Sequence, residues 1–209
     1  MPRCLRQSTA RRAGAVDGGA YEPSARPKAG SGPRGCPVHQ PGKFLFLDSG
    51  STNLALVELL ADDPERTVAT NSIEIAAAVL RRQAPQLIVV GGTVNPIVGG
   101  CVDAAAIQSV SQLNIDQCFM EACSAAPTSG ISAFDASDAA FKRAVLANSR
   151  QSLVLVTNEK FDARAPHRIA TLESIDRLVV EHDAPRRCLD GLVRAGAYIV
   201  IAGSIVSRK

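Results

Sequence analysis

The chain has 209 residues, of which 46% are hydrophobic and 4% aromatic, so it has room for one globular domain with an aliphatic core. No apolar run approaches the roughly 18 residues that a membrane-spanning helix needs. The net charge of +3 is uneven, because residues 1–43 hold eight Lys and Arg against two acidic residues, whereas the rest holds 15 against 18. The mildly acidic remainder lacks the basic surface of a nucleic-acid-binding domain.

Residues 1–42 have the composition of a disordered tail. They are rich in Gly, Pro, Arg, Ser and Ala, show no apolar periodicity, and cannot bury enough surface to offset the entropy of ordering. These residues contain no apolar segment of the kind that a secretory signal needs. Their Arg-rich, acid-poor composition resembles a transit peptide, but they lack the amphipathic helix pattern of one. A basic arm that touches nucleic acid is the alternative to a solvated tail without a fixed role.

The six cysteines form no C-x-x-C pair, which favours a reduced, cytoplasmic chain whose thiols have no special role. Cys36 and His39 would supply half of a zinc site, but no second pair at zinc-like spacing exists. We therefore expect neither a metal nor a cofactor. Dinucleotide binding is not expected either, because the glycine pairs at 91–92 and 99–100 do not have the G-x-G-x-x-G spacing.

From residue 44 onward, short apolar runs alternate with helical patterns. This alternation predicts an α/β domain at 43–209, with a mostly parallel sheet and helices on both faces. The expected strands are 44–48, 67–70, 86–90, 115–120, 152–157, 177–180 and 198–202, with a shorter extended piece at 168–172. The expected helices are 51–60, 73–82, 103–113, 138–148 and 185–195, with a loop or short hairpin at 93–100 and a loop at 122–130. Ser72 or Asn71 should cap the helix at 73–82, and Ser137 the helix at 138–148.

The stretch 44–60 is the clearest candidate for a ligand site. Its apolar run ends on Asp48, a glycine lies in the following turn at Gly50, and hydroxyl side chains follow before a helix begins. A buried strand that ends in such a turn, ahead of a helix start with free N–H donors, is suited to anions. We expect this turn to hold the phosphate of a small ligand.

Other strand ends are polar or rich in glycine as well. Ligands of parallel sheets bind at the carboxyl ends of the strands, so these ends should contribute to one site. They are Thr70-Asn71-Ser72, Gly91-Gly92, Glu121 and Thr157-Asn158-Glu159-Lys160.

The motifs at these strand ends, in this order, resemble the C-terminal sensor domain of DeoR-family transcriptional regulators over residues 44–202. The matching motifs are Asp48-Ser-Gly-Ser-Thr52, Thr70-Asn71-Ser72, Gly91-Gly92, Asp138-x3-Lys142-Arg143 and Lys160-Phe161. The resemblance implies a sugar-phosphate sensor with the fold of ribose-5-phosphate isomerase, glucosamine-6-phosphate deaminase and CoA transferases. Family members are oligomeric bacterial regulators, mostly repressors of sugar or nucleoside catabolism, in which the bound sugar phosphate changes the DNA affinity of an N-terminal helix-turn-helix.

The resemblance also implies roles for individual residues. The turns at 48–52 and 70–72 would hold the phosphate and the sugar hydroxyls, Lys160 would add a cation, and the glycines at 91–92 would let the backbone approach the ligand. The full expected ligand-binding set is Asp48, Ser49, Gly50, Ser51, Thr52, Thr70, Asn71, Ser72, Gly91, Gly92, Glu121, Lys142 and Lys160.

The chain departs from the family pattern in three places. The helix-turn-helix should precede residue 44, but residues 1–43 have no helical periodicity, so we expect that this chain does not bind DNA by itself. A frameshift or a wrong start would explain the tail, and the upstream DNA would then encode the helix-turn-helix. Ala122-Cys123-Ser124 stands where the family has a Gly-bearing turn, and Thr157 stands where it commonly has an Asp.

Two other hypotheses remain open. On the same fold, Glu121 with Asp48 would serve proton or acyl transfer in a sugar-phosphate isomerase or a related enzyme. The chain could also be a fragment without function. No Ser-His-Asp or G-x-S-x-G pattern supports a hydrolase, and we expect a sensor rather than an enzyme, in which a phosphorylated sugar shifts the arrangement of subunits or domains.

Overall fold

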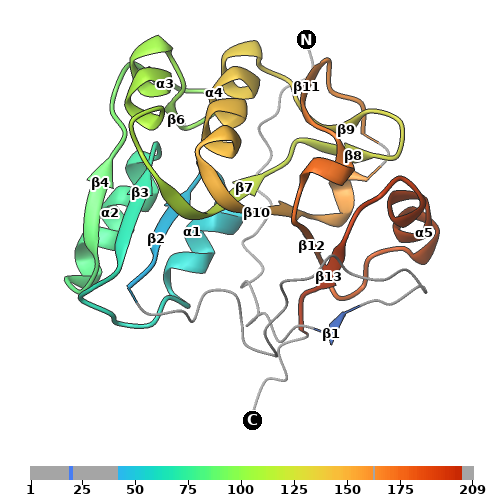
Figure 1. Ribbon diagram of the computed structural model, residues 1–209, viewed down its shortest axis with the longest axis horizontal. Coiled ribbons are helices and arrows are strands. Elements are labelled where there is room, and N and C mark those ends of the chain that lie inside the picture. The colour runs from blue at the N-terminus through green and yellow to red at the C-terminus, as the bar shows by residue number, and fades with distance from the viewer. Residues whose placement is uncertain (1–18, 21–41, 162, 204–209) are drawn as a thin grey trace.

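Most of the apolar runs become strands that pair in parallel, because intervening helices return the chain to the same end of the sheet (Figure 1). The computed structural model describes residues 19–20, 42–161 and 163–203. The expected disorder of 1–42 and the Cys36–His39 pair thus fall almost wholly outside the described residues. The main sheet has the order β1-β13-β12-β10-β7-β2-β3-β4, and only the β1–β13 pair in it is antiparallel.

The strands of this sheet are β1 Gly19–Ala20, β2 Phe44–Leu47, β3 Thr67–Thr70, β4 Gln86–Val89, β7 Ile115–Glu121, β10 Ser149–Val156, β12 Arg177–Val180 and β13 Ile199–Ile201. The helices are α1 Ser51–Val57, α2 Ile73–Arg82, α3 Ala104–Val110, α4 Ala136–Ala147 and α5 Arg186–Arg194, with 3-10 turns η1 Asn158–Lys160 and η2 Leu172–Ser174. The smaller sheets contain β5 Val94–Asn95 with β6 Gly100–Cys101, and β8 Ser124–Ala126 with β9 Gly130–Ala133 and β11 His167–Ala170. Among the described helices, none has both the length and the apolar character that crossing a membrane requires.

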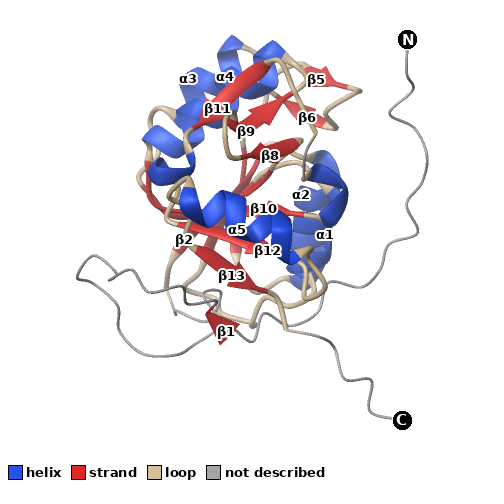
Figure 2. Cartoon of the chain, turned by 90° about the vertical axis from the view of Figure 1, so that its right-hand side faces the viewer, coloured by secondary structure: helices blue, strands red, loops and turns tan. Residues whose placement is uncertain are grey.

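Side chains that alternate along β2 divide the core into two layers. Leu45 and Leu47 pack in a cluster with side chains of α1 and α2. Phe46 points to the opposite face, where its ring centroid lies 6.0 Å from that of Phe141 in α4. Figure 2 shows α1 and α2 on one side of the sheet and α3 and α4 on the other. The expected mostly parallel sheet with helices on both faces is confirmed, and the strands are apolar on both faces for this reason.

The prediction of a loop at 122–130 is wrong, because most of this segment forms a β-hairpin. β8 pairs antiparallel with β9, which also pairs with β11, the extended piece expected near 168–172. Ser124 and Ala125 are buried there although small side chains have little strand preference of their own. Pairing with a strand distant in the sequence therefore decides this structure. The segment expected to be a loop or short hairpin at 93–100 is the β5–β6 hairpin.

Helix boundaries differ from the expected ones by a few residues. α2 has its expected cap, since Ser72 Oγ accepts a hydrogen bond from the backbone N of Ile75 at 3.3 Å. The expected cap at Ser137 is wrong: Asp135 caps α4, with its Oδ1 accepting from the N of Asp138 at 2.9 Å. Asp and Ser are equally good caps, and two of them so close together leave the start of a helix ambiguous. α1 is also shorter than the expected range 51–60.

Candidate functional site

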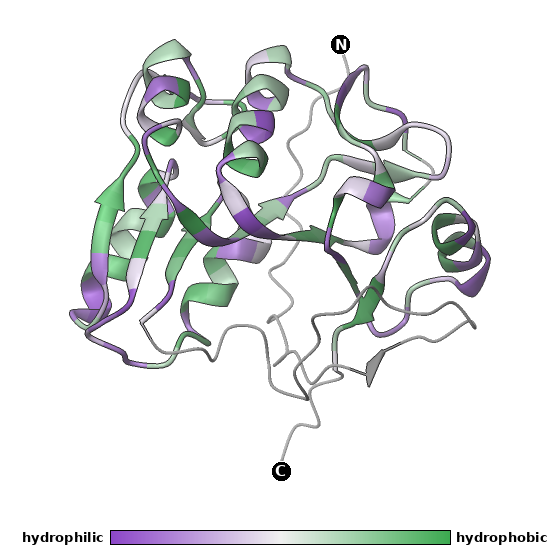
Figure 3. Ribbon diagram, viewed as in Figure 1, coloured by the Kyte–Doolittle hydropathy of each residue, from purple (hydrophilic) through white to green (hydrophobic). Residues whose placement is uncertain are grey.

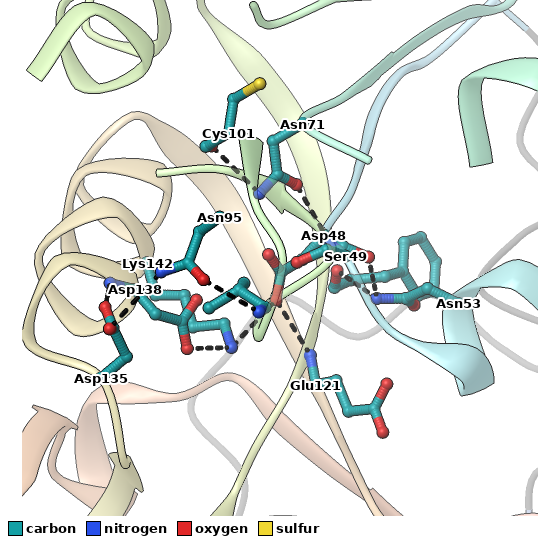
Figure 4. Close-up of polar contacts among 12 residues, drawn as sticks. Asp48, Ser49, Asn53, Asn71, Asn95, Cys101, Glu121, Asp135, Asp138 and Lys142 are labelled. Carbon is teal, nitrogen blue, oxygen red and sulfur yellow. Dashed lines mark hydrogen bonds and ion pairs between the residues drawn. The ribbon is translucent and has the colours of Figure 1, made fainter. Parts of the chain in front are cut away.

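The carboxyl ends of β2, β3 and β7 meet at one edge of the sheet, where they bring several of the expected site residues together (Figure 4). In the parallel register Leu47 pairs with both Thr70 and Phe119. The residues that follow each of these positions therefore become neighbours. We call the segment Asp48–Thr52 the Asp48 turn.

A buried charge cluster lies beneath this turn. Lys142 of α4 places its Nζ 3.3 Å from Oδ2 of Asp48 and 2.8 Å from Oδ2 of Asp138. All three side chains are at most 4% exposed. The Glu121 backbone N also donates to Asp48 Oδ2, at 3.4 Å. Lys142 thus reaches the turn as expected, but it does so as the partner of two buried carboxylates.

The charges of this cluster do not balance when all three groups are ionised, because two carboxylates face one ammonium. Burial raises the pKa of Asp48 to about 7, although the nearby Lys142 opposes the rise. Burial also disfavours the charged form of Lys142, but Asp48 and Asp138 outweigh it and hold the lysine pKa above its ordinary value. The ammonium therefore stays charged, and Asp48 is the group that can take up a proton near neutral pH.

The raised pKa of Asp48 predicts a pH dependence of stability. Between the ordinary value of 3.8 and about 7, the folded chain binds a proton at Asp48 that the unfolded chain does not. The state with more bound protons is favoured as pH falls, so the contribution of Asp48 to stability should increase from about pH 8 to about pH 5. Melting temperatures of the wild type and of Asp48→Asn, which cannot titrate, check this. The variant should lack the gain in stability that the wild type shows as pH falls from about 8 to about 5. If wild type and variant show the same pH dependence of melting temperature, the prediction is wrong.

Asn71 connects the Asp48 turn to the β5–β6 hairpin. Its Oδ1 accepts from the backbone N of Ser49 at 3.0 Å, and its Nδ2 donates to the carbonyl O of Cys101 at 3.3 Å. The N of Cys101 donates in turn to the O of Asn71 at 2.9 Å. A Cβ on Gly100 would lie 2.8 Å from Asn71 Nδ2 and 3.0 Å from its O, so glycine is needed for this close approach.

Asn53 is a site residue that the sequence reasoning missed. Its side chain is fully buried, and Nδ2 donates to the carbonyl O of Asp48 at 2.9 Å and of Phe119 at 3.0 Å. It therefore fastens the Asp48 turn to β7. The sequence did contain a signal for this role. Asn53 has its amide on the same helix face as Leu56 and Leu60, both of which are buried.

Glu121 lies beside the Asp48 turn, where we expected a ligand phosphate. A Cβ on Gly50 would lie 1.8 Å from Glu121 Oε2, so the carboxylate passes directly over this glycine. Burial raises the pKa of Glu121, whereas the ammonium groups of Lys142 and Lys160 and the backbone N–H of Thr52 oppose this rise. The groups expected to bind an anion thus already interact with an anion that belongs to the chain.

Lys160 is half-buried on η1 and contributes positive charge to the same edge. Its Nζ lies 3.0 Å from Oε1 of Glu159. Burial disfavours its charged form, but Glu159 and, more weakly, Glu121 outweigh burial and raise its pKa. Lys160 therefore remains an ammonium group that acts on Glu121.

The remaining expected residues divide into two groups. Thr70 and Ser72 are buried and serve the start of α2, since Thr70 Oγ1 accepts from the N of Ser72 at 3.1 Å. Gly91 and Gly92 are exposed beyond edge strand β4, where a Cβ on Gly92 would lie 2.4 Å from Oδ1 of Asp103. Within the described residues, neither glycine is hydrogen-bonded to the Asp48 turn. The structure gathers the Asp48 turn, Asn71, Glu121, Lys142 and Lys160, but it places the glycine pair apart from them.

Buried polar atoms without hydrogen-bond partners are concentrated at this edge of the sheet. In the described part of the chain, most such side-chain atoms belong to residues at the carboxyl ends of β2, β7 and β10 or at the starts of α1 and α4. They are Asp48 Oδ1, Ser49 Oγ, Asn53 Oδ1, Glu121 Oε2, Asp138 Oδ1, Thr157 Oγ1 and Asn158 Oδ1. Buried polar atoms in folded proteins are nearly always paired, so an unpaired group of this size is suited to binding a polar molecule.

A cavity of about 260 Å³ lies elsewhere, between α5 and β8. It is lined by Ala125, Pro127, Phe161, Arg187, Cys188, Gly191 and Leu192. Apart from Arg187 its lining has no charged side chain, and it includes no residue of the Asp48 turn. Its chemistry therefore suits a polyhydroxylated ligand less well than the strand ends do.

Comparison with protein families matches residues 37–182 to the DeoR C-terminal sensor domain. A putative aga operon transcriptional repressor of Escherichia coli O157:H7 is 25% identical over 164 residues, which are 78% of this chain and 61% of that protein. The uncharacterised HTH-type regulator YgbI of E. coli K12 is 30% identical over 175 residues, 84% of this chain and 68% of YgbI. The E. coli K12 glycerol-3-phosphate regulon repressor is 26% identical over 144 residues, 69% and 56% of the two chains.

Solved structures show a partial likeness of fold. Ribose 5-phosphate isomerase from Plasmodium falciparum superposes with a TM-score of 0.40 and 13% identity, over 60% of this chain and 47% of the isomerase. Ribose 5-phosphate isomerase A from Neisseria gonorrhoeae gives a TM-score of 0.42 and 12% identity, over 60% and 48%. The chain spans only 61% and 63% of the first two curated regulators that it matches.

Proposed function

Because the chain belongs to the DeoR C-terminal sensor domain family, we propose that it binds a phosphorylated sugar as the effector of a transcriptional regulator and places this ligand at the Asp48 turn. The observation that carries the proposed site is the concentration of unpaired buried polar atoms at the carboxyl ends of β2, β7 and β10. A polyhydroxylated ligand with an anionic end could pair with many of these atoms. Residues of four separate elements would then contact a single molecule.

In this proposal the phosphate takes the position of the Glu121 carboxylate. The backbone N–H of Thr52 and the ammonium of Lys160 already act on that carboxylate, and both would favour a phosphate more strongly because it carries more charge. Gly50 allows the approach because a side chain there would collide with the group above it. Glu121 would turn away as the phosphate enters.

The sugar would lie deeper, towards Asp48 and Ser49. An ionised carboxylate is purely an acceptor, and sugar hydroxyls are the donors it requires. Asp48 Oδ1 and Ser49 Oγ have no partner of their own in the described structure, so they are the acceptors we assign to the sugar. Both atoms are buried, which means that ligand entry requires the turn to move.

In this proposal, the movement of the Asp48 turn reports ligand binding to the rest of the protein. A ligand that binds one arrangement of the turn more tightly shifts the population towards it. We propose that this shift reaches neighbouring subunits or domains, as a sensor requires, and that the chain catalyses no reaction. Turnover of any sugar phosphate by the purified protein would overturn the sensor proposal and favour an isomerase-type enzyme.

The site is tested by a melting screen with phosphorylated pentoses, hexoses and glycerol, against the same compounds without phosphate and against inorganic phosphate. Only a molecule that carries both a phosphate and the hydroxyl groups of a sugar or polyol should raise the melting temperature strongly. A ligand at about 100 times its Kd stabilises the folded state by about 2.7 kcal/mol. A screen in which no phosphorylated compound acts would contradict the proposal.

Substitution of Lys160 by Met should weaken the effect of the best ligand about tenfold or more in Kd, since one cation next to the phosphate is lost. Arg187→Met, at the cavity between α5 and β8, is the matched control and should leave the Kd unchanged. Titration by melting temperature or calorimetry measures both variants. A loss confined to Arg187→Met would place the ligand in the α5 cavity instead.

A further inference from the structure

The cavity between α5 and β8, which we call the α5 cavity, lies outside the proposed effector site. Its volume is about 260 Å³, whereas folded interiors contain few spaces larger than a water molecule. The inner wall is apolar, since Ala125 and Leu192 are each 1% exposed and Phe161 is 8% exposed. A cavity of about 150 Å³ with such walls holds benzene, so by proportion this one holds about ten non-hydrogen atoms.

Two contacts between distant segments fix the walls of the α5 cavity. Ala125 and Phe161 are joined by a parallel β-bridge. A Cβ on Gly191 would lie 3.1 Å from Cγ of Pro127, so glycine lets α5 approach the β8–β9 hairpin this closely, although it weakens a helix relative to alanine. Figure 3 shows α5 beside this hairpin, with both apolar and hydrophilic residues along the helix. The cavity is therefore preformed, as ligand sites usually are.

Arg187 supplies a cation at the mouth of the α5 cavity. It belongs to the lining and is nevertheless exposed. Within the residues that the structure describes, it takes part in no salt bridge. It is the second residue of α5, which begins without a side-chain cap, so the positive end of the helix dipole adds to its charge. An apolar chamber with one cation at its entrance is complementary to an apolar molecule with one negative charge.

We propose that the α5 cavity is a second binding site, and that it takes a small aromatic carboxylate. The ring would pack against Phe161 and Leu192, and the carboxylate would accept two parallel N–H bonds from the guanidinium of Arg187. A phosphorylated sugar fits poorly here, because its hydroxyls would lose water against an apolar wall. This inference does not depend on the proposed effector site.

The site is tested on the full chain by the rate at which iodoacetamide alkylates Cys188, a half-buried residue of the lining, followed by mass spectrometry of peptides. Phenylacetate, which has the size that the cavity accepts, should slow this reaction, with half-maximal protection at about 1 mM or below. Phenylacetamide has the same ring without the charge and should protect at least about tenfold more weakly. Cys123 is also half-buried but does not line the cavity, so neither compound should change its alkylation.

Arg187→Met identifies the cation that selects the carboxylate. In this variant phenylacetate should protect Cys188 no better than phenylacetamide does, while alkylation of Cys123 at the wild-type rate shows that the fold is intact. A preference for the acid that survives Arg187→Met, or equal protection by both compounds in the wild type, would overturn the assignment of a carboxylate ligand. A Cys188 that phenylacetate leaves unprotected, or that phosphorylated sugars protect better, would overturn the site itself.

Discussion

Replacement of Lys142 by Met is expected to lower the free energy of unfolding by about 3–5 kcal/mol, the usual cost of removing one partner from a buried ion pair. Lys142 lies within 3.3 Å of Asp48 and 2.8 Å of Asp138, and all three side chains are almost inaccessible to water. Without the ammonium, two carboxylates would face each other in a dry site. Urea unfolding of the wild type and the variant measures the difference.

A rescue variant identifies charge as the cause of this loss. Asp48→Asn/Asp138→Asn/Lys142→Met removes all three charges with little change in volume, so most of the lost stability should return. Lys160→Met is the control for loss of a half-buried lysine whose ion-pair partner, Glu159, is exposed, and it should cost less than about 1 kcal/mol. If the triple variant is as unstable as Lys142→Met, the packing of the lysine side chain is responsible instead of its charge.

The second large effect is expected at Glu121. Substitution by Gln should tighten binding of the phosphorylated effector about tenfold, or about 1.4 kcal/mol, because the ligand no longer competes with a carboxylate of the chain itself. The isosteric amide keeps the side-chain volume next to Gly50 but removes the negative charge. Calorimetric titration of wild type and variant with the best phosphorylated sugar measures the change.

The direction of this change distinguishes two roles of Glu121. A carboxylate that binds a sugar hydroxyl would make the Gln variant weaker than the wild type, and that result would contradict the displacement described above. The unphosphorylated sugar is the control ligand, and its affinity should respond little to the substitution. Asp138→Asn is unsuitable as a control because that residue belongs to the cluster around Lys142.

Much of the fold follows from patterns that are local in the sequence. The continuous apolar runs Phe44–Leu47 and Leu178–Val180 are bounded by polar residues, and they lie in strands β2 and β12 as expected. Ser72 is followed at once by a helical pattern, and it caps α2. In each case the signal and the structure lie within a few residues of each other, so single-sequence reasoning is sufficient.

The rest depends on contacts between distant segments. β8 consists of Ser-Ala-Ala, and only its pairing with β9, which is held in turn by β11, makes it a strand. The expected position of Lys142 near the ligand turn came from a family resemblance. Its partner Asp138 lies one turn away on the same helix, but its partner Asp48 comes within reach only once α4 packs across β2. The overlap of Glu121 with the expected phosphate position likewise requires the register of β7 against β2, which no local pattern specifies.

The hydrogen bonds of Asn71 have a thermodynamic consequence. Through its side chain and backbone, Asn71 connects the N–H of Ser49 in the proposed site to Cys101 in the β5–β6 hairpin. A movement of the turn that breaks or reorients these bonds also displaces the hairpin. Effector binding and the position of the hairpin then share a coupling free energy, and by reciprocity any change that displaces the hairpin also changes effector affinity.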